Sequence, residues 1–90
     1  MIRMFVRHPV NDYATWKKAY DDFDPERGPM GVKGDQVYQA VDNPNDVTAY
    51  HDFETVEAAK AFAASPRLKE VMESAGVAGP PTIWFVSHDS

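Results

Sequence analysis

The chain has 90 residues, of which 43% are hydrophobic and 26% charged, a composition typical of one small globular domain and unlike that of a disordered or fibrous protein. Fourteen acidic against nine basic residues give a net charge of -5 at pH 7, and the basic residues are scattered, so nucleic acid is not an expected partner. The absence of cysteine excludes disulfides, thiolate nucleophiles and thiolate-bound metals.

No segment predicts export or membrane insertion. Residues 1–8 lack the apolar run of a signal peptide, and no stretch approaches the roughly 18 to 20 apolar residues of a membrane span. We therefore expect a cytoplasmic protein with no membrane partner. A domain of this size buries a small core, so association with a second subunit would add stability.

The first elements are a strand and a helix. Alternation of apolar and other residues over 2–8 predicts a strand that ends near His8. Aromatic residues then recur at spacings of three and four, which predicts an amphipathic helix capped by Asn11 or Asp12 and ended by Pro25. The aromatic stripe of this helix consists of Tyr13, Trp16, Tyr20 and Phe23.

A loop and a hairpin follow. Residues 24–34 contain several Pro and Gly without periodicity, which predicts a loop of about ten residues. Alternation resumes over 35–42 and again over 47–53. The Asn, Asp and Pro residues of 42–46 predict the turn between these two antiparallel strands.

The last third of the chain predicts an interrupted helix and a final strand. Thr55 can cap a helix whose inner stripe includes Ala59 and Phe62. Ser65 and Pro66 interrupt this helix and can start a short second one, which Gly76 ends. Residues 82–88 predict the last strand.

The resulting order βαββαβ predicts an α+β architecture. With short connections it packs most simply as a four-stranded antiparallel sheet that carries both helical segments on one face. The first and third strands are then central and adjacent. Either set of alternating residues on the uncovered face is too apolar for water alone to cover, so we expect a second copy of the domain there.

The whole plan resembles the dimeric α+β barrel superfamily, in particular the small single-domain proteins similar to antibiotic biosynthesis monooxygenases. The resemblance covers nearly all of residues 1–88. Its most informative stretches, 52–62, 65–68 and 75–77, resemble that superfamily's junction between the third strand and its helix and its broken second helix. The resemblance implies a ferredoxin-like fold, a homodimer and a ligand cavity between the sheet and the helices of each subunit.

His51 is the candidate catalytic residue. By alternation it shares a strand face with Phe53, which is expected to point toward the helices. An imidazole can take a proton from an acidic phenol or enol, or polarise a carbonyl. The alternative interpretation is a hydrogen-bonded core histidine. His8 lies toward the opposite end of the sheet and could line the same elongated cavity.

Aromatic residues are the candidate walls of a site for a small apolar or aromatic ligand, with a Tyr hydroxyl or the Trp16 indole donating one orienting hydrogen bond. The alternative is that the helical stripe is plain core. Which strand face lines the pocket stays open, so candidates come from both faces. The candidate binding residues are His8, Tyr13, Trp16, Tyr20, Tyr38, Tyr50 and Trp84.

Members of the resembled superfamily include cofactor-independent oxygenases, cyclases, lyases, haem-binding proteins and proteins without known activity, so the fold does not choose among them. We expect a ligand-binding protein that, as an enzyme, would be a cofactor-free monooxygenase or a cyclase or isomerase. No cofactor is expected. A metal site is not expected either, because the backbones of His88 and His51 should be about 10 Å apart with the first strand between them, and Asp52 should point to the opposite face. The alternatives are a non-catalytic stress-response or ligand-binding module and a haem protein with His51 or His8 as axial ligand.

Overall fold

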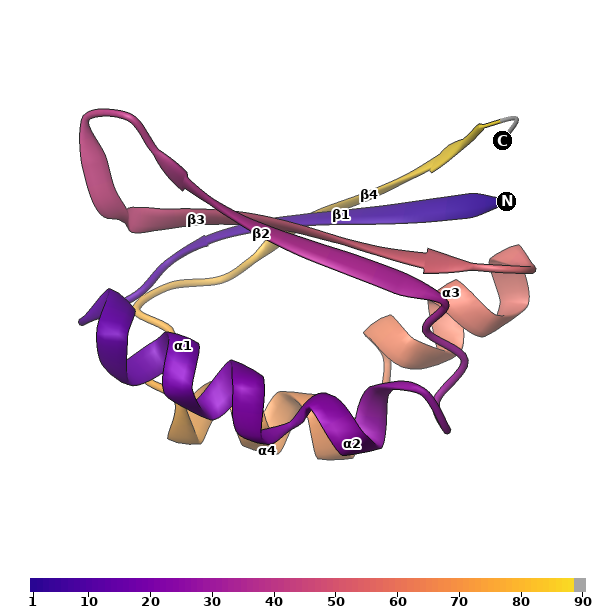
Figure 1. Ribbon diagram of the computed structural model, residues 1–90, viewed down its shortest axis with the longest axis horizontal. Helices are drawn as coiled ribbons and strands as arrows, with labels where there is room; N and C mark the ends of the chain where they lie inside the picture. Colours follow the sequence, from indigo (N-terminus) through magenta and orange to yellow (C-terminus); the bar gives the residue numbers. More distant parts are fainter. Residues whose placement is uncertain (89–90) are drawn as a thin grey trace.

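The computed structural model describes residues 1–88, and its helices cover one face of a single sheet (Figure 1). The elements are β1 (Ile2–Pro9), α1 (Tyr13–Asp22), α2 (Asp24–Arg27), β2 (Gly34–Ala40), β3 (Asn43–Phe53), α3 (Val56–Ala63), α4 (Pro66–Ser74) and β4 (Thr82–Ser87). All strand pairs are antiparallel, in the order β2-β3-β1-β4. This confirms the predicted ferredoxin-like α+β fold with β1 and β3 at the centre.

Alternation along the strands gives the sheet two different faces. On β1, Met4, Val6 and His8 are buried beneath the helices, whereas Arg3 and Arg7 lie on the other face. The helix-facing residues of β3 are buried in the same way and together with helical side chains form two hydrophobic clusters. One cluster contains Met4, Phe23, Phe53, Ala59 and Phe62, and the other contains Val10, Trp16, Val47 and Ala75.

Side-chain caps begin the helices where the sequence predicts them. Asp12 accepts a hydrogen bond from the backbone N–H of Thr15 at 3.0 Å. Thr55 and Ser65 do the same at the starts of α3 and α4. Each cap satisfies an amide that has no partner within its helix. The helices α3 and α4 form separately because the backbone of Ser65 is extended and Pro66 has no N–H with which to continue α3.

Two segments differ from the sequence-based expectation. Pro25 does not simply end a helix: it stands in the first turn of α2, where its missing N–H costs no hydrogen bond. The expected loop therefore shortens to residues 28–33. The hairpin turn narrows to residues 41–42, because a register shift after Gln39 lets Asn43 pair with Ala40 and extends β3.

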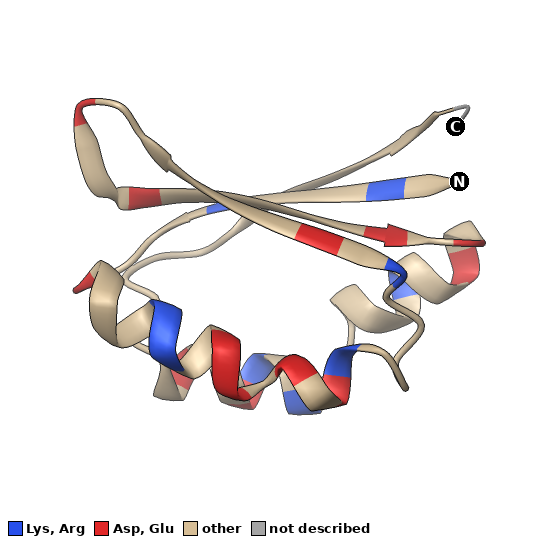
Figure 2. Cartoon of the chain, viewed as in Figure 1, with Lys and Arg blue, Asp and Glu red and all other residues tan. Residues whose placement is uncertain are grey.

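Charged residues are distributed unevenly over the layers. Figure 2 shows acidic and basic positions interspersed along the helices, with fewer along the strands. Among residues 1–88, no helix combines the length and the apolar character that crossing a membrane would require.

Candidate functional site

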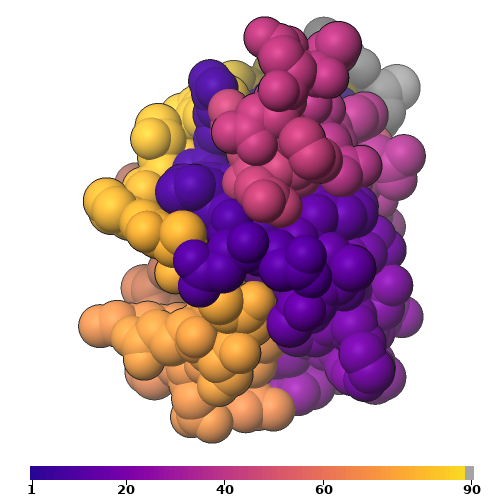
Figure 3. All heavy atoms as spheres, turned by 90° about the vertical axis from the view of Figure 1, so that its left-hand side faces the viewer, coloured from indigo at the N-terminus to yellow at the C-terminus, as the bar shows by residue number. Residues whose placement is uncertain are grey.

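A cavity of about 700 Å³ lies between the helix-facing side of the sheet and the helices α1, α3 and α4. Its walls are mostly apolar. The strands contribute Met4, Val6, Ala49 and Ile83, and the helices contribute residues such as Trp16 and Phe62. Figure 3 shows the surface indented between β4, in yellow, and the orange segment that contains α4. Lys69 and Glu73 on α4 are among the lining residues and add polar groups to that side.

His51 occupies the centre of the sheet at one end of this cavity. It stands on β3 directly opposite Asp35 on β2 and Met4 on β1, and its ring lies 5.1 Å from that of Phe62. Only 4% of the residue is exposed. Its Nε2 lies 3.2 Å from the hydroxyl of Tyr20, and its Nδ1 is buried without a hydrogen-bond partner among the described residues.

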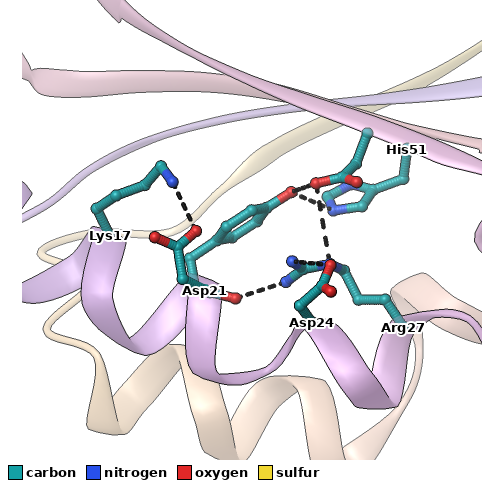
Figure 4. Close-up of polar contacts among 7 residues, drawn as sticks. Lys17, Asp21, Asp24, Arg27 and His51 are labelled. Carbon is teal, nitrogen blue, oxygen red and sulfur yellow. Dashed lines mark hydrogen bonds and ion pairs between the residues drawn. The ribbon is translucent and has the colours of Figure 1, made fainter.

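Tyr20 connects His51 to a carboxylate. Its Oη donates a hydrogen bond to Oδ2 of Asp35 at 2.5 Å, so the side chains form a chain from His51 through Tyr20 to Asp35. Figure 4 shows His51 at one end of these dashed contacts, with Arg27 close by. Burial and the hydrogen bond to Asp35 raise the pKa of Tyr20 far above its ordinary value. Tyr20 is therefore a neutral phenol throughout the physiological pH range.

Arg27 closes the site from the side of α2. Its guanidinium lies over the Tyr20 ring at 4.0 Å and donates to the backbone carbonyl of Tyr20 at 2.7 Å and to Asp24 at 3.0 Å. Its Nε is 3.9 Å from Oδ2 of Asp35 and has no hydrogen-bond partner among the described residues. A buried cation thus stands beside the hydrogen-bonded chain and holds the Tyr20 ring in place.

The surroundings of His51 keep its imidazole neutral at pH 7. Burial in the apolar core is the main cause that lowers its pKa, to about 4. The positive charge of Arg27 lowers the pKa further, and the negative charge of Asp35 opposes this. A neutral imidazole can accept one hydrogen bond and donate another.

His8 places a second imidazole at the other end of the cavity. Its ring packs edge-on against Trp16 at 5.5 Å, and its Nδ1 also lacks a partner among the described residues. Burial lowers its pKa. His8 on β1 pairs with Val47 on β3, and Val47 precedes His51 by four positions. The two histidines are therefore about 13 Å apart along the strand direction.

The structure brings together four of the predicted site residues: His8, Trp16, Tyr20 and His51 line one cavity. The rings of Trp16 and Tyr20 stack at 5.1 Å and form a continuous aromatic wall. Tyr13 does not reach the cavity. Its ring packs 6.1 Å from Trp16, in the cluster beneath α1.

The structure places Tyr38, Tyr50 and Trp84 on the opposite, helix-free face of the sheet, away from the cavity. Alternation explains this. Residue 50 on β3 and residue 84 on β4 each pair with Phe5 on β1, and the neighbours of Phe5, Met4 and Val6, face the helices. The Trp84 ring stacks on Phe5 at 5.3 Å. The question of which strand face lines the pocket is thereby answered in favour of the face that carries His51.

Sequence reasoning missed Arg27 and Asp35. Arg27 follows Tyr20 by seven residues and therefore lies on the same helical face once α2 continues the direction of α1, a relation concealed by interpreting Pro25 as a helix end. Asp35 shares the alternating face of Val37. An acidic residue on the face that points toward the helices indicates a buried polar contact, and this pattern is visible in the sequence.

The histidines that could ligate a metal ion lie on different strands or at different positions along them. Within residues 1–88 no three potential metal-ligating side chains are grouped together. His88 lies near Asp52, 3.6 Å away, on the helix-free face. Nε2 of His51 is within hydrogen-bond distance of Tyr20, an arrangement that fits a hydrogen-bonding imidazole better than an axial haem ligand.

Solved structures share this fold over the full length of the chain. A candidate antibiotic biosynthesis monooxygenase from Bordetella bronchiseptica superposes with a TM-score of 0.83 at 19% identity, covering 99% of this chain and 97% of that one. The monooxygenase ActVA-Orf6 of Streptomyces coelicolor, in complex with nanaomycin D, gives 0.68 at 23% identity and 99% and 88% coverage. SnoaB, a cofactor-independent oxygenase from Streptomyces nogalater, gives 0.77 at 12% identity and 99% and 90% coverage.

These neighbours confirm the resemblance in fold to antibiotic biosynthesis monooxygenases. No protein-family model and no curated protein matches the sequence. At such low identities the likeness establishes the architecture, and chemistry must be argued from the side chains of this chain.

Proposed function

We propose that the protein binds a small, flat, largely apolar ligand in the cavity and oxidises it as a cofactor-independent monooxygenase. The cavity size and its aromatic wall support the ligand class, and the fold shared with a monooxygenase and with a cofactor-independent oxygenase supports the reaction class. His51 acts as the base. It removes a proton from a phenolic or enolic hydroxyl, which leaves an electron-rich anion that reacts with dioxygen.

The overall reaction balances without a further reductant. A ring C–H and the hydroxyl of a hydroxyarene become the two carbonyls of a quinone. One oxygen atom of dioxygen enters the ligand, and the other leaves as water with the hydrogens of the broken C–H and O–H bonds. The ligand supplies all the electrons that reduce dioxygen. The roles left to the protein are binding, orientation, proton removal and exclusion of bulk water.

One observation carries the ligand-binding part of this proposal. Four buried side-chain nitrogens lack a hydrogen-bond partner among the described residues, and three of them belong to the cavity-lining residues His8, Arg27 and His51. Buried polar atoms in folded proteins are nearly always paired. A ligand with oxygen atoms near both ends of an apolar body would supply partners within the same cavity.

The experiment measures oxygen consumption with a panel of dihydroxynaphthalenes, corrected for oxidation without protein, and uses labelled dioxygen to follow its incorporation. We expect His51→Ala to lower the rate by roughly 100-fold or more, the usual contribution of a positioned base. His88→Ala is the matched control on the opposite face and should retain the rate. Equal rates for wild type and His51→Ala would contradict the catalytic assignment, and binding without oxygen uptake would favour a non-catalytic binding module.

We further propose that a second copy of the chain covers the helix-free face of the sheet. Tyr38 and Trp84 are 51% and 40% exposed there. The charges of the face are already paired within the chain, Arg3 with Asp52 and Arg7 with Asp46. An aromatic surface with internally neutralised charges suits a self-complementary homodimer better than a charged partner.

A further inference from the structure

The hydrogen bonds around Tyr20 fix where the protons of the site are. Its single hydroxyl proton has two possible acceptors, Oδ2 of Asp35 at 2.5 Å and Nε2 of His51 at 3.2 Å. The shorter contact is to the carboxylate, and hydrogen bonds to an ionised acceptor are the stronger kind. The proton of Tyr20 is therefore directed at Asp35.

This assignment determines the tautomer of His51. With its proton given to Asp35, Oη of Tyr20 can only accept from His51, so Nε2 must carry a hydrogen. The neutral ring then has a lone pair on Nδ1, which is buried without a partner among the described residues. The other tautomer would leave a buried N–H donor unpaired at Nδ1 and would face two acceptors with one tyrosine hydroxyl, a less favourable arrangement.

We infer that Asp35 and Tyr20 hold His51 in the Nε2–H tautomer, so that the cavity selects ligands carrying a phenolic or enolic hydroxyl over ligands that offer only carbonyl oxygens. In this state His51 has no free N–H with which to polarise a carbonyl, and its remaining function toward a ligand is to accept. Asp35 is a positioning residue that acts through Tyr20. The ligand preference rests on the proposed function, and the tautomer does not.

The same chain of groups provides a way out for the ligand proton. Asp35 borders a second, polar pocket of about 520 Å³ between α1, α2 and β2, and Tyr20 and Arg27 line both pockets. The Asp35 side chain is 29% exposed, whereas Arg27 is 5% exposed. Tyr20 thus forms the partition between the apolar cavity and a polar region that water can enter.

Proton transfer along this chain conserves atoms and charge. The ligand O–H bond breaks as Nδ1–H forms on His51, the Nε2 proton passes to Oη of Tyr20, and the hydroxyl proton of Tyr20 passes to Oδ2 of Asp35. The ligand becomes an anion, His51 and Tyr20 stay neutral and Asp35 becomes a neutral acid. No imidazolium has to persist in the buried site, which would disfavour it.

The first test reads the tautomer directly from the ¹⁵N chemical shifts of His51 in uniformly labelled protein at pH 7.5. We expect a protonated-type Nε2 and an unprotonated-type Nδ1, with the resonances assigned through His8→Gln and His88→Gln. In Tyr20→Phe and in Asp35→Asn the two nitrogens should move toward a mixture of tautomers. Asp21→Asn is the control, because this exposed residue of α1 pairs with Lys17 and does not contact His51.

An Nδ1–H tautomer in the wild type would overturn the inference, as would wild-type shifts in both variants. If Tyr20→Phe does not fold, Asp35→Asn alone decides, because it changes one atom of a partly exposed side chain. Neither result depends on a ligand. Failure of the proposed oxygenase activity would leave this measurement valid.

The second test concerns ligand class and uses 1-naphthol, 1-methoxynaphthalene and 1,4-naphthoquinone as probes. We expect wild type to bind 1-naphthol about tenfold more tightly than the ether, since only the naphthol can donate to Nδ1. Asp35→Asn should reduce this ratio, and Asp21→Asn should keep it. Equal or tighter binding of the ether or the quinone would overturn the ligand preference. Absence of binding by all three would count against both the preference and the proposed function.

Discussion

At the scale of single residues, the two cavity histidines are held in their uncharged form by burial. His51 and His8 are 4% and 3% exposed, and in both the loss of hydration is the main cause that lowers the pKa. Within residues 1–88 neither imidazole has a carboxylate in hydrogen-bond contact, since Tyr20 stands between His51 and Asp35. Charging either ring therefore requires the core to open or to reorganise.

This burial predicts a loss of stability in mild acid. Between pH 6.5 and 5 the unfolded chain protonates His51, whereas the folded chain, with a pKa of about 4, does not. The unfolded state binds more protons, so the free energy of unfolding falls as pH falls, by on the order of 2 kcal/mol over this window. Urea unfolding at pH 7, 6 and 5 measures the slope.

His51→Gln should show a smaller pH slope than the wild type, with the remainder due in part to His8, whose pKa is lowered in the same direction. Thr48→Val, a change on β3 that removes no titratable group, is the control and should keep the wild-type slope. If the free energy of unfolding of His51→Gln depends on pH as strongly as that of the wild type, the burial of His51 does not cause the loss of stability in acid.

At the scale of elements, the connection of α4 to the rest of the fold depends on the glycine that follows its C-terminal end. Ser65 caps its start, and Gly76 follows its last turn with a φ of +83°. The carbonyl of Gly76 accepts from the backbone N–H of Asn11 at 2.9 Å, so the same residue connects α4 to the segment between β1 and α1. A left-handed backbone at this junction requires glycine, because a Cβ atom would strain it.

Gly76→Ala is expected to lower the free energy of unfolding by about 1 to 2 kcal/mol. Gly28→Ala adds the same methyl group where φ is -56° and no atom lies within 4 Å, so it should change stability by less than about 0.5 kcal/mol. Urea unfolding of the two variants checks this. Equal destabilisation of both would contradict the argument from backbone conformation.

The elements also show what local sequence can and cannot predict. Strand alternation, the caps Asp12, Thr55 and Ser65, and the break at Pro66 are local signals, and the structure confirms them. Pro25 is ambiguous locally, because proline both ends helices and begins them. The start of β3 at Asn43 depends on pairing with β2, which no local pattern contains.

The candidate site also has features that the local sequence predicts and features that depend on tertiary packing. The inward direction of His51 was available from the alternation of β3, and the cavity brings it together with His8 as the sequence allowed. The contact of Tyr20 with both Asp35 and His51 was not available, since it joins α1, β2 and β3 and depends on how the helices lie across the sheet. Tertiary packing decided which aromatic residues line the cavity.

At the scale of the whole molecule, the helix-free face of the sheet carries a group of aromatic side chains that none of the described helices covers. Phe5, Tyr38, Tyr50 and Trp84 form a connected group of aromatic rings on it, with centroid separations of 5.3 to 6.3 Å. Arg3 lies over the Tyr50 ring at 3.7 Å. Monomeric proteins seldom leave such a contiguous surface in contact with water.

The proposed homodimer predicts that wild-type protein sediments as a dimer at micromolar concentration and that Trp84→Lys shifts it toward the monomer, because the new charge would be buried in the interface. Ala61→Lys introduces the same charge at an exposed position of α3 and should leave the dimer intact. Circular dichroism verifies that both variants are folded. A monomeric wild type would contradict the proposed assembly.

The alternation along β1 has a consequence for how such a protein can diversify. Met4, Val6 and His8 line the cavity, and the residues between them lie on the opposite face of the sheet. Adjacent positions of β1 therefore contribute to two different surfaces of the protein. A mutation that reshapes the interior need not disturb the exterior. Substitutions at alternate positions of β1 can therefore change the lining of the cavity while the opposite face of the sheet stays the same.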